Sequence, residues 1–230
     1  MKYQYLLINF LTILFPLLLS FDKKVAFYKS WKYIWPGMAV TGLFFLAWDV
    51  LFTVKGVWRF NDHYIIGIKF FELPLEEVLF FLTVPFACLF IYACLNRYVK
   101  WQVPQVASDI ITNAIIVYAL LNCCFNYHKL YTLVTFALAL AALILVRYVF
   151  RAPWLSRFYL AYGVCLLPFY LVNGFLTSIP IVIYNNAQNL GNRIGTIPIE
   201  DHFYLLVLLL MNAAFFEYLS NKKIIESLSH

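Results

Sequence analysis

The sequence has 230 residues, of which 64% are hydrophobic and only 12% are charged, with a formal net charge of +6. Soluble globular domains are about 45–50% apolar and about 25% charged, so this composition excludes a soluble domain and predicts an integral membrane protein. Because the Lys and Arg residues are scattered over the ends of apolar runs, we expect no nucleic-acid partner.

Seven apolar runs follow one another along the chain, and each is close to the roughly 17–25 residues that a membrane-spanning helix needs. Only Lys2 precedes the first run, and no small-residue cleavage site follows it, so we expect a helix there and not a signal peptide. The sequence therefore predicts an all-α integral membrane fold with seven transmembrane helices. The runs cover residues 3–21, 33–54, 78–96, 110–127, 130–146, 158–177 and 198–219.

The basic residues predict the orientation of the chain in the membrane. Eleven of the 17 Lys and Arg residues, including Lys222 and Lys223, fall in the loops and the tail on the side of the C-terminus, against six on the other side. The positive-inside rule then places the N-terminus outside and the C-terminus in the cytoplasm.

An internal repeat emerges when the sequence is shifted against itself by 124 residues without a gap. The shift places LPLEE (residues 73–77) on IPIED (residues 197–201), and it pairs Asn61 with Asn185. We expect two three-helix repeats, residues 1–97 and 129–230, joined by helix 4 within residues 98–128. One connecting helix gives the repeats the same orientation, so both acidic motifs lie on one side of the membrane.

The acidic motifs hold the predicted catalytic residues, which are Glu76, Glu77, Glu200 and Asp201. In a single copy, acids that follow a proline are ordinary helix N-terminus chemistry. Two copies at the start of uncharged apolar runs favour a functional site, because ionisable groups inside a membrane usually mark function. Carboxyl groups held close together at low dielectric cannot all ionise, so we expect at least one to keep its proton and act as an acid.

Other polar residues are predicted to support these carboxyl groups. Asp49 and Asn173, which the repeat pairs, lie in the preceding helices at a similar depth and complete one buried polar cluster. Lys69 and Arg193 either tune the carboxylates or anchor the chain at the membrane interface. The supporting polar set is Asp49, Asn173, Asn61, Asn185, Lys69 and Arg193.

An acid in an apolar, aromatic pocket suggests protonation of an alkene, because aromatic faces stabilise a carbocation without attacking it. Most aromatic residues of a membrane protein only pack, so each candidate for substrate and cation binding has that alternative role. The five cysteines lie inside apolar runs without zinc-like spacing, and no GxGxxG, Walker or HExxH motif occurs, so we expect no metal and no cofactor. The aromatic residues nearest the motifs include Phe60 and Tyr184, and the candidates for substrate and cation binding are Trp48, Phe52, Trp58, Phe80, Phe81 and Tyr204.

With PLEEVLFF in one half and GNRIGTIPIEDHFY in the other, the chain resembles the flavin-free lycopene cyclase domain family over nearly its whole length. The resemblance implies conversion of lycopene, taken from the membrane lipid, through γ-carotene to β-carotene by proton transfer without redox change. It carries the family's acidic residues onto Glu76, Glu77, Glu200 and Asp201. It leaves open which carboxyl is the acid, whether one or both ends of lycopene are cyclised, and whether the chain forms a homo-oligomer.

Three alternatives are weighed beside this interpretation. A carotenoid 1,2-hydratase would let water capture the same cation, and product analysis separates the two. A retinal-binding protein needs a lysine in the last helix, which has none before Lys222. The third is a transporter or a purely structural membrane protein, with the carboxylates as a proton relay, and the aromatic pocket and, more strongly, the family resemblance argue against it.

Overall fold

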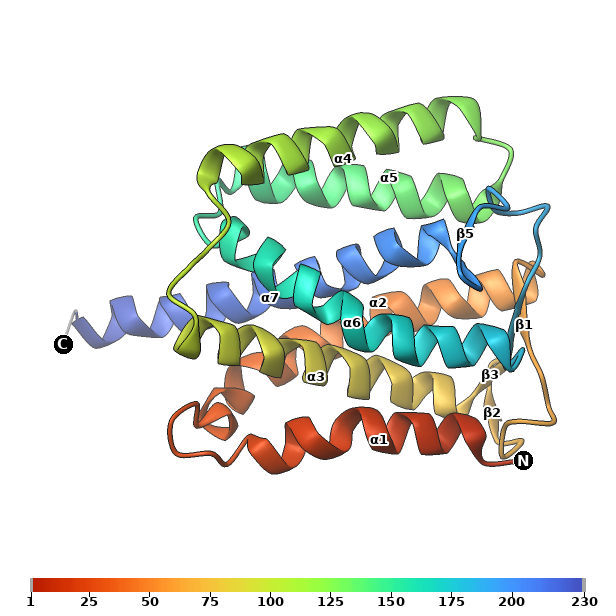
Figure 1. Cartoon of the computed structure of the whole chain (residues 1–230), viewed down its shortest axis with the longest axis horizontal. Helices are drawn as coiled ribbons and strands as arrows, with labels where there is room; N and C mark the ends of the chain where they lie inside the picture. The colour runs from red at the N-terminus through yellow and green to blue at the C-terminus, as the bar shows by residue number, and fades with distance from the viewer. Residues whose placement is uncertain (1, 229–230) are drawn as a thin grey trace.

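The computed structural model describes the backbone of residues 2–228 and the side chains up to residue 220. The side chains of Lys222 and Lys223, and residues 1 and 229–230 at the outer ends of the predicted repeats, lie outside this description. Within the described part, seven α-helices form one antiparallel bundle (Figure 1). They are α1 (Gln4–Leu19), α2 (Trp31–Val54), α3 (Leu75–Tyr98), α4 (Gln105–Phe125), α5 (Leu130–Ile144), α6 (Leu155–Ser178) and α7 (Ile199–Leu228).

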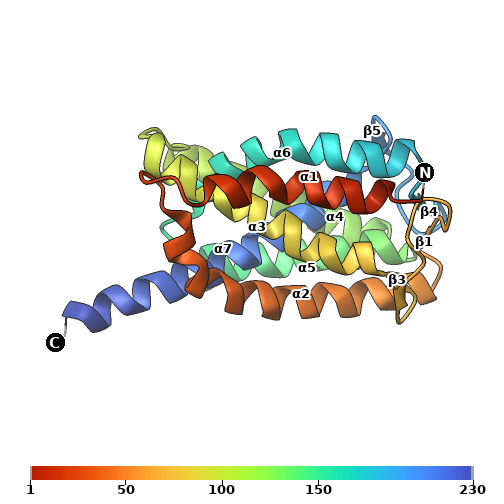
Figure 2. The ribbon, with the colours of Figure 1, turned by 90° about the horizontal axis from the view of Figure 1, so that it is seen from below.

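The lengths of the helices confirm most of the predicted membrane spans. Among the described residues, the helices α2 to α7 are long and apolar enough to cross a membrane, which defines a multi-pass membrane protein. Helix α1 has only 16 residues and is shorter than such a span, so the seventh crossing stays a prediction. The start of α1 and the end of α7 lie at opposite ends of the bundle (Figures 1 and 2). Which end faces the cytoplasm also stays a prediction.

Six short strands, which the all-α prediction did not include, gather at the end of the bundle where α1 begins (Figure 1). Each pairs with one antiparallel partner over two or three residues, too briefly to leave an alternating pattern in the sequence. The pairs are β1 (Trp58–Phe60) with β4 (Val182–Tyr184), β2 (Lys69–Phe70) with β3 (Leu73–Pro74), and β5 (Arg193–Ile194) with β6 (Ile197–Pro198). The β1–β4 pair joins the two halves of the chain.

Close approach and buried polar contacts hold the helices together. The side-chain amide of Asn9 in α1 donates to the Glu76 carbonyl oxygen at 2.9 Å, and its oxygen accepts from Thr83 Oγ1 at 2.8 Å. Between α2 and α7, a Cβ added at Gly37 would lie 2.5 Å from the Phe215 Cβ. Only a glycine therefore permits this helix crossing.

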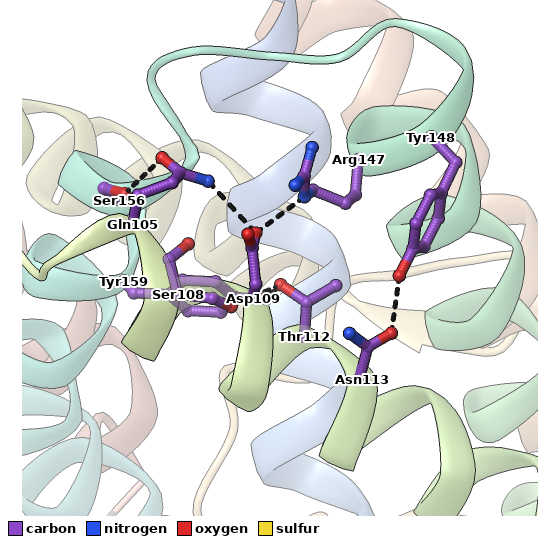
Figure 3. Close-up of polar contacts among 9 residues, drawn as sticks. All are labelled: Gln105, Ser108, Asp109, Thr112, Asn113, Arg147, Tyr148, Ser156 and Tyr159. Atoms are coloured by element: carbon purple, nitrogen blue, oxygen red, sulfur yellow. Dashed lines mark hydrogen bonds and ion pairs between the residues drawn. The ribbon is translucent and has the colours of Figure 1, made fainter.

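At the opposite end of the bundle, a polar cluster connects α4 with η2 (Leu145–Val149) and α6 (Figure 3). Asp109 of α4 accepts hydrogen bonds from Gln105 Nε2 at 3.0 Å and from Arg147 Nε at 2.7 Å. Arg147 lies in η2, a π-helical turn that ends α5, and such turns reorient single side chains. The Thr112 and Tyr159 hydroxyl groups, 2.7 Å apart, extend the cluster to α6.

Candidate active site

Each acidic motif lies at the start of a helix, directly after a tight turn between two short strands. In the first motif β2 and β3 pair through a two-residue turn, in which Phe71 and Glu72 have φ values of 48° and 71°. Positive φ at both central positions is the geometry of a type I′ hairpin turn. Pro74 then lies directly before α3, and both Glu76 and Glu77 fall in the first helical turn. The second motif also passes from β5 through a two-residue turn to β6 and α7, but there only Gly195 has a positive φ, 62°.

The first carboxyl group of each motif binds a loop. Glu76 Oε1 accepts from the Ile66 backbone N–H at 2.7 Å, and Glu200 Oε1 accepts from the Leu190 N–H at the same distance. Both donors precede a glycine with positive φ, a conformation that glycine adopts without strain. Thr132 Oγ1 also donates to Glu200 Oε1 at 2.7 Å. These two carboxyl groups are fully buried and fix the loops over the helix starts.

The second carboxyl group of each motif faces a shared pocket. Glu77 and Asp201 line a cavity of about 60 Å³, and Asp49 and Asn173 line it as well. Three of these side chains are nearly inaccessible, with 3% exposed for Asp49, 7% for Glu77 and 3% for Asp201. The structure therefore brings both halves of the predicted cluster together at the end of the bundle that carries the strands, while Glu76 and Glu200 point to the loops.

The first side of the pocket, the Asp49 corner, consists of Asp49, Glu77, Tyr5 and Tyr204. The Tyr5 hydroxyl donates to Glu77 Oε2, and the Tyr204 hydroxyl donates to Asp49 Oδ1 at 2.8 Å. The Asp49 and Glu77 carboxyl groups line the same pocket as neighbours. Like charges held close together at low dielectric cannot both ionise, so one of these two carboxyl groups keeps its proton.

The opposite side, the Asp201 corner, consists of Asp201, Asn173, Tyr131 and Tyr184. Asp201 accepts from the Tyr131 hydroxyl at 2.6 Å, from the Tyr184 hydroxyl at 2.8 Å and from the Asn173 amide at 3.3 Å. Burial raises the pKa of Tyr184 well above its ordinary value, and the neighbouring Asp201 carboxylate raises it further, so this hydroxyl stays a donor. Three donors aimed at one carboxyl group stabilise its ionised form.

The aromatic candidates divide into pocket walls and a packed layer behind them. Trp58, Phe80 and Tyr204 line the pocket directly. Trp48 packs on Tyr204 with ring centroids 4.8 Å apart, and Phe52 packs on Trp58 at 5.2 Å. The third member of this layer, Phe81, lies 6.4 Å from the Tyr204 ring.

The remaining supporting residues do not line the pocket and lie in or directly after the short strands. Lys69 pairs with the exposed Asp62 at 2.8 Å, and Arg193 donates to the Thr196 carbonyl oxygen and packs over the Tyr184 ring. The Asn61 and Asn185 side chains accept from backbone N–H groups two residues further on. Among the described residues, no group of three or more His, Cys, Asp or Glu is arranged to hold a metal ion.

Two tyrosines of the pocket were missed in the sequence. Tyr5 and Tyr131 donate to Glu77 and Asp201, and their backbone N–H groups bind the Tyr64 and Gln188 carbonyl oxygens. They play equivalent roles in the two halves, yet they are 126 residues apart. The ungapped shift of 124 residues could not align them, whereas a shift with a two-residue gap would have done so.

The bundle and its pocket define a class: a helical membrane protein with carboxyl groups and tyrosines buried in an aromatic chamber. The sequence profile of the lycopene cyclase family matches residues 2–95 and 128–219, and the chain belongs to this family. The gap between the two matches contains α4, the predicted connector.

Two fungal relatives, each described as a bifunctional lycopene cyclase/phytoene synthase, are similar to parts of the chain. The protein from Leptosphaeria maculans is 35% identical over 89 residues, which is 38% of this chain and 14% of the relative. The protein from Pyrenophora tritici-repentis is 36% identical over 52 residues, which is 23% of this chain and 9% of the relative. The matches thus cover only a small part of these much longer proteins. No solved structure matches the chain.

Proposed function

We propose that the chain is a lycopene β-cyclase, an isomerase of carotenoid biosynthesis that works by acid–base catalysis without a cofactor. Family membership supports the reaction class. The observation that carries the chemistry is the pocket, where the neighbouring Asp49 and Glu77 carboxyl groups and the separately hydrogen-bonded Asp201 face one aromatic cavity. Carboxyl groups held in different environments supply the acid and the base of an enzyme.

The Asp49 corner is the proton donor in this proposal. The proton shared by Asp49 and Glu77 moves to C2 of the terminal C1=C2 bond of lycopene, which leaves a cation at C1. The C5=C6 bond attacks C1, so the C1–C6 bond closes the ring and the cation moves to C5. The faces of Trp58 and Phe80 stabilise this charge.

The Asp201 corner is the base. Asp201 removes the C6 proton, and the C5=C6 double bond of the β-ring forms. Three hydrogen-bond donors stabilise the ionised form of Asp201 and offset part of the cost of burying its charge. The cycle closes when this proton returns to the Asp49–Glu77 pair, so the reaction consumes neither protons nor electrons.

The size of the pocket favours ring closure over hydration. A cavity of about 60 Å³ holds a few water molecules at most, and an end group of the substrate would displace them. Water is then absent when the cation forms, and the internal C5=C6 bond is the nucleophile within reach. The β1–β4 pair supplies Trp58, Phe60, Val182 and Tyr184 to the pocket wall.

Expression in a lycopene-accumulating cell tests the proposal, with pigments separated by chromatography. We expect γ-carotene and β-carotene from the natural chain and lycopene alone from Glu77→Gln. The matched control is Glu217→Gln, the same change in α7 at a glutamate that binds Tyr92 and lies outside the pocket. A 1-hydroxylated product would indicate a hydratase, and unchanged lycopene with the natural chain in the membrane would refute a cyclase.

A further inference from the structure

We propose that an apolar groove between α1 and α6, floored by α3, is the lateral entrance and binding site for the extended hydrocarbon chain of the substrate. The groove has a volume of about 460 Å³, far larger than the acidic pocket. In Figure 1, α3 runs between α1 and α6, and in Figure 2 it lies deeper in the molecule than either. The proposed function is needed only to identify the bound hydrocarbon as a polyene.

The groove opens sideways, towards the surface that faces lipid. Its rim carries Leu11 and Phe15 from α1 and Leu171 and Phe175 from α6, which are 51%, 63%, 66% and 54% exposed. Its floor contains the buried Val84, Ala87 and Cys88 of α3. A hydrocarbon dissolved in the bilayer can therefore enter without crossing water.

The groove borders the acidic pocket. Phe80, Phe169, Asn173 and Leu205 line both spaces, so the two are adjacent and only these side chains stand between them. From Phe80 the floor continues along α3 to Ile91, which is about 16 Å at the helical rise of 1.5 Å per residue. This shape suits a linear molecule with one end in the pocket and its body in the groove.

The lining selects a ligand without a charged head group. Among the described residues, neither the groove nor the pocket is lined by Lys or Arg, so a lipid phosphate would find no cation there. The hydroxyl of Thr12, one of the few polar groups in the groove, already donates to the Ile8 carbonyl oxygen at 2.8 Å. In the described part of the chain, the groove offers free polar contacts to a ligand only where Asn173 borders the acidic pocket. Such a lining suits an uncharged polyene.

The binding test uses Glu77→Gln protein purified from lycopene-accumulating cells, so that bound pigment is measured without turnover. Adding Ala87→Trp, which fills the floor of the groove, should lower the lycopene retained per protein about tenfold or more. Adding Leu43→Trp, at a side chain of α2 that is 69% exposed and outside the groove, should leave it unchanged.

A double change at the rim, Leu11→Trp with Leu171→Trp, replaces Ala87→Trp if that variant does not fold, because both side chains already face lipid. The groove proposal would be refuted if a folded groove variant retained as much lycopene as Glu77→Gln protein alone. It would also be refuted if Glu77→Gln protein alone retained none. If lycopene retention depends on the groove but the natural protein forms no ring, the proposed binding groove is supported and the proposed cyclase activity is rejected.

Discussion

Asn173 occupies the place in the second half that Asp49 occupies in the first, and this difference predicts the effect of Asp49→Asn. The new amide is nearly isosteric and can donate to Glu77 as Asn173 donates to Asp201 at 3.3 Å. Its oxygen can still accept from the Tyr204 hydroxyl. Every hydrogen bond of the Asp49 corner is thus replaced, but the shared proton is lost and Glu77 becomes a plain acceptor.

The expected magnitude follows from the lost general acid. Such a group contributes about 10²–10⁴ in rate, so the barrier rises by about 2.7–5.5 kcal/mol. Since the hydrogen bonds are preserved, we expect the free energy of unfolding to change by less than about 1 kcal/mol. Initial rates of ring formation in membranes measure the first quantity, and thermal unfolding in detergent measures the second. Asp109→Asn, the same change in the polar cluster of Figure 3, is the control.

A full rate from Asp49→Asn would refute the shared-proton reasoning. The double variant Asp49→Asn with Asn173→Asp sharpens the test, because it moves the second carboxyl group of the pair beside Asp201. We expect part of the lost rate to return, with Asp201 as the donor and Glu77 as the base. A double variant no faster than the single one would show that the two corners cannot exchange roles.

Further variants test the other contacts of the site and the bundle. Tyr131→Phe removes one donor from Asp201 and should slow ring formation about tenfold, equal to about 1.4 kcal/mol, and an unchanged rate would contradict its role. Glu200→Ala should lower the free energy of unfolding by about 1–3 kcal/mol, because the Leu190 N–H and the buried Thr132 hydroxyl lose their acceptor, and thermal unfolding measures this. Gly37→Ala should destabilise the α2–α7 contact by about 1–3 kcal/mol, whereas Gly42→Ala, with open space around it, should not; equal melting temperatures would exclude the clash.

The internal repeat predicted much of this site, because polar residues in apolar helices leave few arrangements. It placed the two acidic motifs on one side, and the structure brings Glu77, Asp201, Asp49 and Asn173 to one pocket. The different directions of Glu76 and Glu77 were not predictable from the pattern. Neighbouring residues of a helix point about 100° apart, and in a helix that is apolar all round no periodicity shows which direction is inward.

The boundaries of the helices were predicted less well than their existence. The third uncharged run begins at residue 78, whereas α3 begins at Leu75, with the buried Glu76 and Glu77 in its first turn, as expected of acids that follow a proline. A search for uncharged runs excludes such residues by construction. The strand pairs were missed for a related reason, since they depend on partners far away in the chain, such as Trp58 opposite Tyr184.

The replacement of Asp49 by Asn173 between the two corners also limits the order of events on a symmetrical molecule. Lycopene has two identical ends, and in the proposed mechanism only the Asp49 corner donates a proton. If both ends are cyclised, we therefore expect them to react one after the other. The product with one ring would then leave the pocket, reverse its direction in the bilayer and enter again, and between the two reactions it would be dissolved in the surrounding lipid.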